Sequence, residues 1–486
     1  MDAFKSLILK IVILVTAYLS IISVVPFLAL SCFGFPTVDD LIMFTTVKRD
    51  GILYTLDWYN THVTGRMTSV LFHSALAKLT ILYRSDPWIW NAAAAFTYYS
   101  LVVAVMVTFI RTAVPKIPFG ISVVWASVHV AGTMIIAVNG YGIGTPSQPL
   151  WPMVLALYTF SFTLFPLVIS AMIIAWDRDM AHWVWSSLLM ALVFMHGVSH
   201  EVVIVGLGAA LLIFALRMFQ VVGFGRAVVS YGHLSRVRLG VSLRNQWDSP
   251  AFFYTLLALG AAVVAAAVVH LLSPSVVARG AYWPAQMTWM EAVVEAAPIA
   301  LRIVTTPFDV TPPVYLAYFG FSVIIGLSNP LRESLSRDSR FILLMPIVMF
   351  VLIAFVSTTA SLVMLGRDIP RVVHFVMLYG GLAVGCFGLF VGSLVREYVW
   401  SRGSRGLLEA GAAVVMVGAI YMDPYFVARV KEVTGPGMIY GGGILERVGR
   451  LAEGMDRVVH LDELERPSTS IVPTPLHPPR NEQKFR

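Results

Sequence analysis

Two adjacent carboxylates, Asp39 and Asp40, follow closely on the first long apolar run of the sequence, residues 7–30. One acid could act as a general base while its neighbour orients it or binds a metal ion, because adjacent carboxylates can divide these roles. The alternative is an ordinary helix start, since Asp is a favoured N-cap residue. A cap needs only one acid, however, and a second one at a membrane edge must be solvated, paired or metal-bound.

An arginine follows in the same segment, in the stretch "YNTHVTGRMTS" (59–69). Gly65 allows the backbone to turn, and Arg66 then stands at the membrane interface. The ordinary interpretation is a snorkelling arginine. The functional interpretation is a clamp for a phosphate group, because guanidinium donors match phosphate oxygens. His62 is expected to line the same pocket as a loop residue rather than to act as a ligand.

The stretch "HGVSHE" places His196, His200 and Glu201 in a tight turn between two apolar runs. A His and a Glu in such a turn could bind a metal, but the spacing differs from metal signatures such as HExxH. We interpret the three residues first as polar side chains lining a pocket and only second as a metal site.

A later stretch, "GRDIPR", contains Arg367, Asp368 and Arg371, and His374 follows it. The topology below places these arginines outside, against the usual bias of basic residues toward the cytoplasm. That favours a bound anion, such as a lipid phosphate, over a purely topological role. An ion pair between Arg367 and Asp368 is the simpler alternative.

Aromatic residues and glycines provide two weaker signals. Tyr282 and Trp283 could stack on sugar rings, although aromatic residues at a membrane interface usually form only the anchoring belt. The stretch "NGYGIGTPSQPLW" (139–151) contains three glycines. It is not a GxGxxG motif after a strand, so we reject a nucleotide-binding fold.

The elements that must position these residues are membrane helices. Only 13% of the 486 residues are charged and 58% are hydrophobic, whereas a soluble protein carries about 25% charged residues. Several apolar runs reach the roughly 20 residues that cross a bilayer. The predicted spans are 7–30, 88–110, 118–137, 152–175, 182–198, 202–219, 251–272, 313–328, 341–360, 375–395 and 407–421.

The basic loops fix the expected orientation. The loop 217–244 holds five arginines and no acid, and 329–340 and 396–405 are also basic. All of them fall on the cytoplasmic side only if the run 67–83 does not cross the membrane. We therefore place 67–83 at the outer interface. The fold predicted is an all-α polytopic membrane protein with about eleven spans, interfacial helices in the first outer loop, the N-terminus inside and the C-terminus outside.

This topology gathers the unusual polar segments on the outer face, which suggests a site rather than a set of connectors. They are 31–87, 139–151, 196–201, 273–312, 365–374 and 422–486. Residues 1–421 are predicted to form a transmembrane catalytic domain. Residues 422–486 are predicted to form an extracytoplasmic segment that is rich in Gly and Pro and disordered at its end.

Other classes are disfavoured by composition. The net charge of +7 comes mostly from short basic loops, and no nucleic-acid motif is present, so we expect no nucleic-acid partner. The two cysteines, Cys32 and Cys386, form no CxxC motif and predict no disulfide framework. The features that remain are an outward-facing site with paired acids, arginines and aromatic residues.

The pattern "VDDLIMF" followed by "WYNTHVTGRMTS" resembles the DD…GR pattern of bacterial members of the GT-C superfamily of polytopic glycosyltransferases, such as those that glucosylate O-antigen. The resemblance implies a fold with an acidic motif after the first span and juxtamembrane helices behind it. It also implies a polyprenyl-phosphate-sugar donor, a lipid-linked or cell-envelope glycan acceptor, in some members a divalent cation (Mg²⁺ or Mn²⁺), and a bacterial inner membrane location.

Carried over by position, the resemblance makes Asp39 the catalytic base and Asp40 its helper or metal ligand. Arg66 would orient the acid loop or contact phosphate. Arg367 and Arg371 are suggested as a phosphate clamp by their positive charge and their predicted place on the outer side of the membrane, not by a family motif.

Two rival functions stay open. A glycan polymerase or ligase also has arginine-rich outer loops, but usually lacks an acid pair after the first span. A lipid or solute transporter would be expected to show charges or broken helices at mid-membrane and repeated halves; the sequence shows no repeat.

Overall fold

The computed structural model describes residues 2–32, 38–62, 64, 66–82, 87–139, 155–177, 183–208, 211–212, 250–275, 285–332, 340–366, 370–399 and 405–433. Within these residues the chain is helical and contains no strand. The helices are α1 (Asp2–Ile22), α2 (Val25–Cys32), α3 (Val38–His62), α4 (Met67–Leu82), α5 (Pro87–Ala113), α6 (Phe119–Asn139), the π-helix η2 (Leu155–Phe160), α8 (Ser161–Asp177), α9 (Trp183–Ser199), α12 (Pro250–Leu271), α14 (Trp289–Val310), α15 (Pro312–Ser328), the 3₁₀-helix η4 (Arg340–Leu344), α16 (Met345–Leu365), α17 (Pro370–Val399), α18 (Arg405–Tyr421) and α19 (Pro424–Val433).

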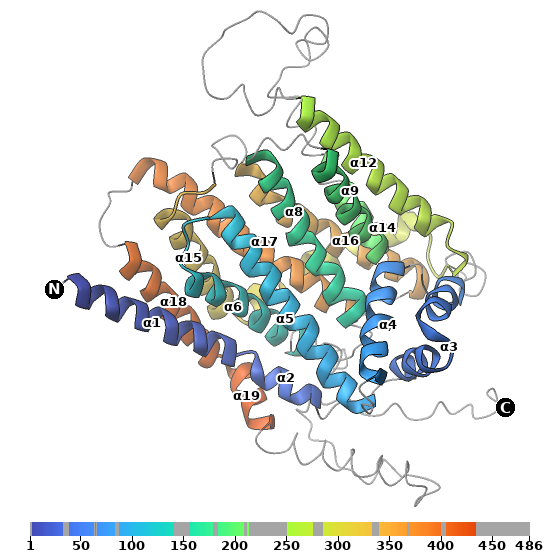
Figure 1. The fold of residues 1–486 in the computed structure, drawn as a ribbon, viewed down its shortest axis with the longest axis horizontal. Coiled ribbons are helices and arrows are strands. Elements are labelled where there is room, and N and C mark those ends of the chain that lie inside the picture. The colour runs from blue at the N-terminus through green and yellow to red at the C-terminus, as the bar shows by residue number, and fades with distance from the viewer. Residues whose placement is uncertain are drawn as a thin grey trace, which may run out of the picture.

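Six helical segments in the described part of the chain are long and apolar enough to cross a membrane, or up to eight spans if each of two bent helix pairs counts as one. The six are Ser6–Ala29, Ala92–Ala113, Phe119–Ile136, Leu155–Ile174, Ile342–Met364 and Phe375–Arg396. The architecture is therefore an all-α polytopic membrane protein. Figure 1 shows these helices packed as one bundle.

The number of spans differs from the prediction of eleven. Helix α12 (Pro250–Leu271) covers the predicted span 251–272, and α9 (Trp183–Ser199), with 17 residues, covers 182–198. The predicted spans 313–328 and 407–421 correspond to α15 and α18, and each of these helices belongs to a bent pair. The predicted span 202–219 lies partly outside the described residues. Eleven spans are thus not confirmed, because hydropathy alone does not register where an apolar helix bends or stops.

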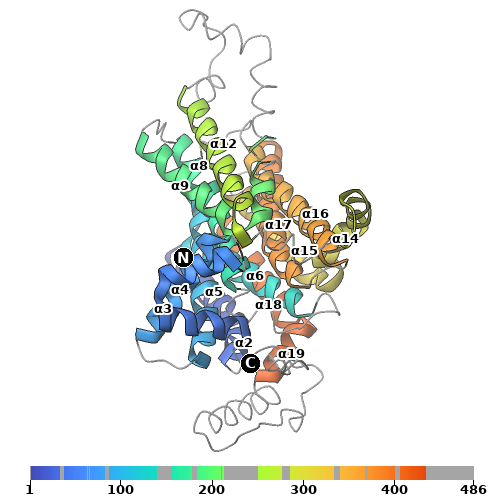
Figure 2. The same ribbon diagram turned by 90° about the vertical axis from the view of Figure 1, so that its right-hand side faces the viewer.

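The core is formed where α15 packs along α17. Gly392 of α17 faces Gly326 of α15, and Gly388 faces Ser322 one turn away. A Cβ at Gly392 would lie only 2.1 Å from the backbone oxygen of Val323. Small residues allow two helix backbones to approach this closely, which is a common way for membrane helices to associate. Figure 2 shows α15 and α17 side by side, in the half of the bundle that also holds α14 and α16.

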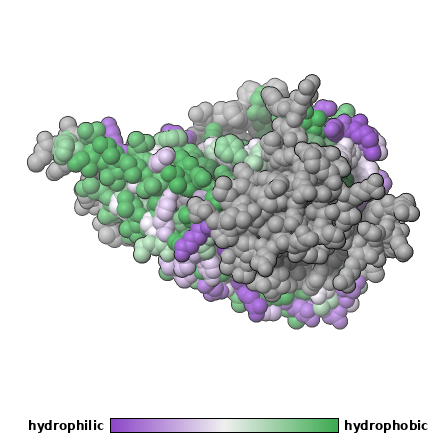
Figure 3. All heavy atoms as spheres, turned by 90° about the horizontal axis from the view of Figure 1, so that it is seen from below, coloured by the Kyte–Doolittle hydropathy of each residue, from purple (hydrophilic) through white to green (hydrophobic). Residues whose placement is uncertain are grey.

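Helix α1 has the opposite character and exposes apolar side chains. Phe4, Leu14 and Tyr18 are each at least 65% exposed. Figure 3, a view from below, shows a continuous hydrophobic surface on the left, the side on which α1 lies in Figure 1. Exposed apolar side chains on a long apolar helix are consistent with contact with lipid tails.

Helices α3 and α4 form a hairpin at one end of the bundle, at the right of Figure 1. Neither is among the candidate spans. Helix α3 bends at Gly51, which has a φ of 84° that only glycine adopts at low cost. A small separate core that includes Met43, Val47, Tyr59 and Val70 holds the two helices together.

Two helix pairs are sharply bent. Helices α14 and α15 meet at 89°, and α18 and α19 meet at 60°. The hydroxyl of Thr311, at the first joint, donates a hydrogen bond of 2.5 Å to the carboxylate of Asp423, at the second joint. The carboxylate in turn accepts from the backbone N–H of Tyr425 at the start of α19. One buried interaction therefore joins the two bends.

Two of the polar segments contain helices that the sequence analysis did not predict. The segment 273–312 contains the 22-residue helix α14, which starts at a capping box formed by Thr288 and Glu291. The segment 422–486 begins with α19, capped by Asp423; residues beyond 433 lie outside the described part. Both cap signals are visible in the sequence.

Segments predicted to share a side of the membrane do lie together. Ser273, after α12, donates a hydrogen bond to the backbone oxygen of Asn60 in α3. At the other end, Arg332 binds the backbone oxygen of Thr112 in α5. The first contact joins two segments predicted to be outer, and the second joins two predicted to be inner.

Candidate functional site

An ion pair between Arg66 and Glu201 joins segments 135 residues apart. The Nε of Arg66 donates to Oε2 of Glu201 at 2.7 Å, and a terminal nitrogen donates to Oε1 at 2.5 Å. This two-point geometry is the strong form of an arginine–carboxylate pair. The Arg66 side chain is 12% exposed and that of Glu201 is 45% exposed. The pair therefore sits at the edge of the folded bundle.

Each charge stabilises the other. Burial opposes ionisation of both groups, but the attraction outweighs it. The carboxylate of Glu201 keeps the pKa of Arg66 above its usual value, and the guanidinium of Arg66 holds the pKa of Glu201 well below its usual value. The guanidinium also lies 5.5 Å from the centre of the Tyr158 ring, a cation–π contact. Arg66 is thus held on two sides.

Hydrogen bonds position the start of α4 against the end of α9. The hydroxyl of Ser69 donates to the backbone oxygen of Ser199 at 3.0 Å. The hydroxyl of Ser199 lies 2.6 Å from that of Ser161 in α8. The turn before α4 is closed by the Thr64 N–H, which donates to the oxygen of Tyr59 at 2.7 Å. These contacts fix Arg66 opposite Glu201.

His200 lies beside the pair and is only 3% exposed. Its ring stacks on Phe375 with 4.6 Å between ring centres, and Tyr158 lies 5.2 Å away. Burial, and then the charge of Arg66, lower the pKa of His200 to about 3, so the ring is neutral. The N–H of Val202 donates to Nδ1, which leaves the ring proton on Nε2.

The contact with Phe375 brings the start of α17 to the same place. Arg371 and His374 belong to the first turns of α17, and Arg371 is one turn before Phe375. Their side chains, and the whole of Arg367, lie outside the described residues. The described contacts therefore bring Arg66, the turn with His200 and Glu201, and the first turns of α17 together.

Two more histidines line the neighbourhood of the end of α9. His196 is fully buried, with its ring centre 5.9 Å from that of Phe165. His270 of α12 hydrogen-bonds through Nε2 to the backbone oxygen of Gly197 at 3.2 Å. His62, in contrast, is exposed, and its described contacts are with Trp58 of its own helix. The structure thus groups His196 and His270 with His200, but does not bring His62 to them.

Asp39 and Asp40 lie in the first turn of α3, and their side chains lie outside the described part. Met43, one turn later, accepts a hydrogen bond from Ser74 of α4. Ser74 is eight residues beyond Arg66, or about 12 Å along a helix. No described contact brings the acids to the Arg66–Glu201 pair, although the acids and Arg66 belong to one hairpin. Tyr282 and Trp283 lie outside the described residues.

Among the described residues, no group of three or more His, Cys, Asp or Glu side chains is arranged to hold a metal ion. The Asp40 carboxylate, suggested above as a ligand, is not among the described side chains. The chemistry of Asp39 and Asp40 nevertheless suits Mg²⁺ or Mn²⁺, because these ions prefer carboxylate oxygens.

Tyr158 and Phe375 lie within apolar runs, and sequence analysis did not select them as site residues. Tyr158 belongs to the π-helix η2, and π-helical turns are frequent at functional sites. The wider turn is not visible in the pattern of apolar residues. The stacking of Phe375 on His200 depends on how α17 packs, so only the tertiary structure shows it.

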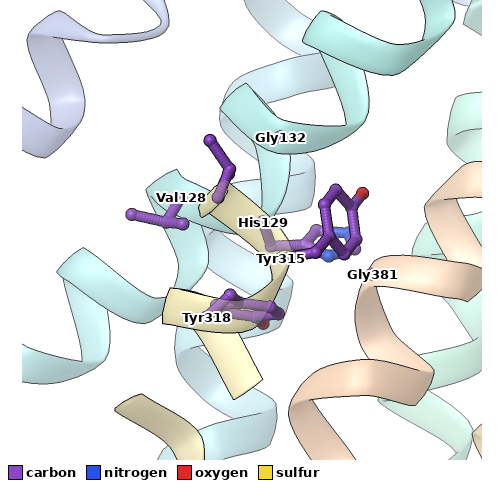
Figure 4. Close-up of a pocket in the computed structure, with 7 residues that line it drawn as sticks. Val128, His129, Gly132, Tyr315, Tyr318 and Gly381 are labelled. Carbon is purple, nitrogen blue, oxygen red and sulfur yellow. The ribbon is translucent and has the colours of Figure 1, made fainter. Parts of the chain in front are cut away.

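A second polar cluster lies inside the bundle (Figure 4). His129 of α6 and Tyr315 and Tyr318 of α15 line a narrow gap next to Gly381 of α17. His129 and Tyr318 are each 2% exposed, and their side-chain polar atoms have no hydrogen-bond partner among the described residues. The gap is too small to hold a water molecule, so this cluster has no room for a ligand.

Comparisons with protein-family models, curated proteins and solved structures find no match for this chain. The functional argument therefore rests on the residues and their arrangement.

Proposed function

We propose that this protein is an integral membrane glycosyltransferase that moves a sugar from a polyprenyl-phosphate donor to a lipid-linked or cell-envelope glycan acceptor. The observation that carries the proposal is the Arg66–Glu201 pair. It fixes the hairpin that bears Asp39 and Asp40 to the bundle, beside the start of α17 with Arg371. Acids, a buried arginine and a second arginine thus belong to one end of the molecule.

The proposed reaction needs a base and a stabilised leaving group. Asp39 takes the proton of the acceptor hydroxyl as the hydroxyl oxygen bonds to the anomeric carbon. The bond from that carbon to the phosphate oxygen breaks, and polyprenyl phosphate leaves with the electron pair. Arg66 and Arg371, with Arg367, stabilise the charge on the phosphate. A divalent cation held by Asp40 would add a Lewis acid to this site.

A polysaccharide polymerase or ligase is the second candidate. The described contacts assemble Arg66, His200 and Glu201 with the start of α17, but show no contact between them and the acid pair. An arginine-centred site without the acids fits that class better. The two bent helix pairs are the one feature that fits a transporter.

The test is sugar transfer by purified protein in nanodiscs, with a panel of polyprenyl-phosphate sugars and a lipid-linked acceptor extract. Asp39→Asn, Asp40→Asn and Arg66→Gln are compared with Asp50→Asn, a control on the same hairpin whose carboxylate pairs only with exposed Arg49. We expect wild type and the control to transfer sugar, and Asp39→Asn and Arg66→Gln to lose at least about 100-fold.

Transfer that survives in both aspartate variants but not in Arg66→Gln would exclude Asp39 as the base and favour the polymerase or ligase. Absence of transfer by wild type with every donor would count against the proposed reaction itself.

A further inference from the structure

We propose that Glu201 occupies an anion site formed by Arg66 and His200, and that the phosphate group of a prenyl-phosphate lipid takes its place when the lipid binds. This inference rests on the proposed function, since it describes how the same site would hold the donor. It assigns Glu201 the role of a competing internal anion rather than that of a metal ligand.

The two partners of the pair are unequally held. The Arg66 side chain is 12% exposed and is fixed by the Tyr158 ring. Glu201 is 45% exposed and begins the helical segment 201–208. Its carboxylate can turn into solvent by side-chain rotation, whereas Arg66 cannot leave without repacking. A departing Glu201 would leave a positive, mostly buried two-point donor in place.

His200 adds a donor close to the pair, since its ring lies beside Glu201, with Nδ1 3.9 Å from Oε2. Because Nδ1 accepts from Val202, the neutral ring carries its proton on Nε2. That nitrogen is buried and has no hydrogen-bond partner in the described part of the chain. A buried donor without an acceptor costs about 1–3 kcal/mol. An anion with several oxygens could accept hydrogen bonds from both His200 and Arg66. The carboxylate of Glu201 accepts hydrogen bonds from Arg66 with both of its oxygens and leaves Nε2 of His200 without an acceptor.

The start of α17 adds to the attraction for anions. The backbone N–H groups at the start of a long helix carry partial positive charge. Phe375, in the second turn of α17, stacks on His200 and so brings the first turns of this helix near the pair, and Arg371 precedes Phe375 by one turn in the sequence. These features favour an anion over a cation at the site.

Charge and shape favour a phosphodiester as the replacement. The guanidinium fork matches phosphate as well as carboxylate. A sugar joined to a prenyl chain through one phosphate carries a single negative charge, the same as Glu201, so the exchange leaves the charge beside buried Arg66 unchanged. Because the site lies at the end of the apolar bundle, a prenyl chain could stay in the membrane while its phosphate binds.

The test measures binding to the full-length protein in detergent by calorimetry. The probes are a short-chain prenyl phosphate, the corresponding prenyl alcohol and inorganic phosphate. Glu201→Gln keeps the shape of the side chain and removes its charge. We expect this variant to bind prenyl phosphate at least about tenfold more tightly than wild type, and the alcohol no more tightly. Asp50→Asn, which removes the matching carboxylate of the exposed Arg49–Asp50 pair, should bind like wild type.

A double variant, Arg66→Gln with Glu201→Gln, should lose the gain. If Glu201→Gln does not fold, Glu201→Asp, which keeps the charge but shortens the reach, should show a smaller gain. Unchanged or weaker binding of prenyl phosphate in a folded Glu201 variant overturns the proposal. An equal gain for inorganic phosphate keeps the anion site but rejects the lipid as its specific ligand.

The two proposals fail in different ways. Tighter prenyl-phosphate binding without sugar transfer by wild type would count against the glycosyltransferase and leave the anion exchange standing. Sugar transfer with no effect of Glu201 on binding would do the reverse.

Discussion

At the residue scale, the low pKa of His200 predicts that the stability of the protein depends on pH. Its pKa is about 3 in the folded protein, against 6.5 for an unperturbed side chain. Between these values the unfolded chain binds a proton that the folded protein excludes. Stability from this residue is therefore complete above about pH 6.5 and falls as the pH drops toward 3, by at most about 1.4 kcal/mol per pH unit.

His200→Phe can keep the stack on Phe375 but cannot titrate. We expect the apparent melting temperature of wild type to fall more between pH 7 and pH 5 than that of the variant. Glu201, Arg66, His196 and His270 face His200 and are unchanged in both proteins. Glu201 also stays ionised over this range because Arg66 keeps its pKa low. Identical pH dependence in the two proteins would show that His200 is already charged or solvated.

Sequence reasoning selected Arg66, His200 and Glu201, because charged residues at the ends of apolar runs stand out. It did not predict that Arg66 pairs with Glu201, since nothing local links residues 135 positions apart. It also could not find Tyr158 and Phe375. An aromatic residue inside an apolar run looks the same whether it faces lipid, the core or a charged group.

At the scale of the elements, the apolar runs predicted where most helices lie but not their bends. A hydropathy window averages over about 20 residues, so it cannot detect the 89° angle between α14 and α15. The angle arises at Thr311, where Pro312 and Pro313 begin α15 and remove two N–H groups that could continue α14. Helix α14, whose start is capped by Thr288, was not predicted because it lies in a segment interpreted only as polar.

The contact between α15 and α17 gives a second prediction. An added Cβ at Gly392 would lie 2.1 Å from the oxygen of Val323, which is backbone and cannot rotate away. Gly392→Ala must therefore separate the helices, and we expect a loss of about 1–3 kcal/mol or more. Gly418→Ala in α18 meets nothing within 4 Å and should be neutral or slightly stabilising.

The two variants can be compared by heating them in detergent and measuring the fraction of protein that stays monodisperse. A Gly392→Ala protein as stable as Gly418→Ala would mean that α15 and α17 do not pack this closely.

At the scale of the whole molecule, three contacts sort the ends of the bundle. Arg66 with Glu201 and Ser273 with Asn60 lie at the end that carries the α3–α4 hairpin. Arg332 binds α5 at the opposite end. The distribution of basic residues separates the same two groups, so charge pattern and packing agree on which segments share a side. The positive-inside rule predicts that the end with the α3–α4 hairpin is the outer one.

That orientation can be tested with two cysteines placed at opposite ends. Lys116 is exposed between α5 and α6, on the side predicted to be cytoplasmic, and Leu272 is 74% exposed after α12, on the side predicted to be outer. With Cys32 and Cys386 replaced by alanine, a membrane-impermeant maleimide should label Leu272→Cys in intact cells. It should label Lys116→Cys only after the cells are permeabilised. The reverse pattern would place Arg66, Glu201 and the acid pair on the cytoplasmic side. Nucleotide sugars would then be within reach, and the argument for a polyprenyl-phosphate donor would lose its basis.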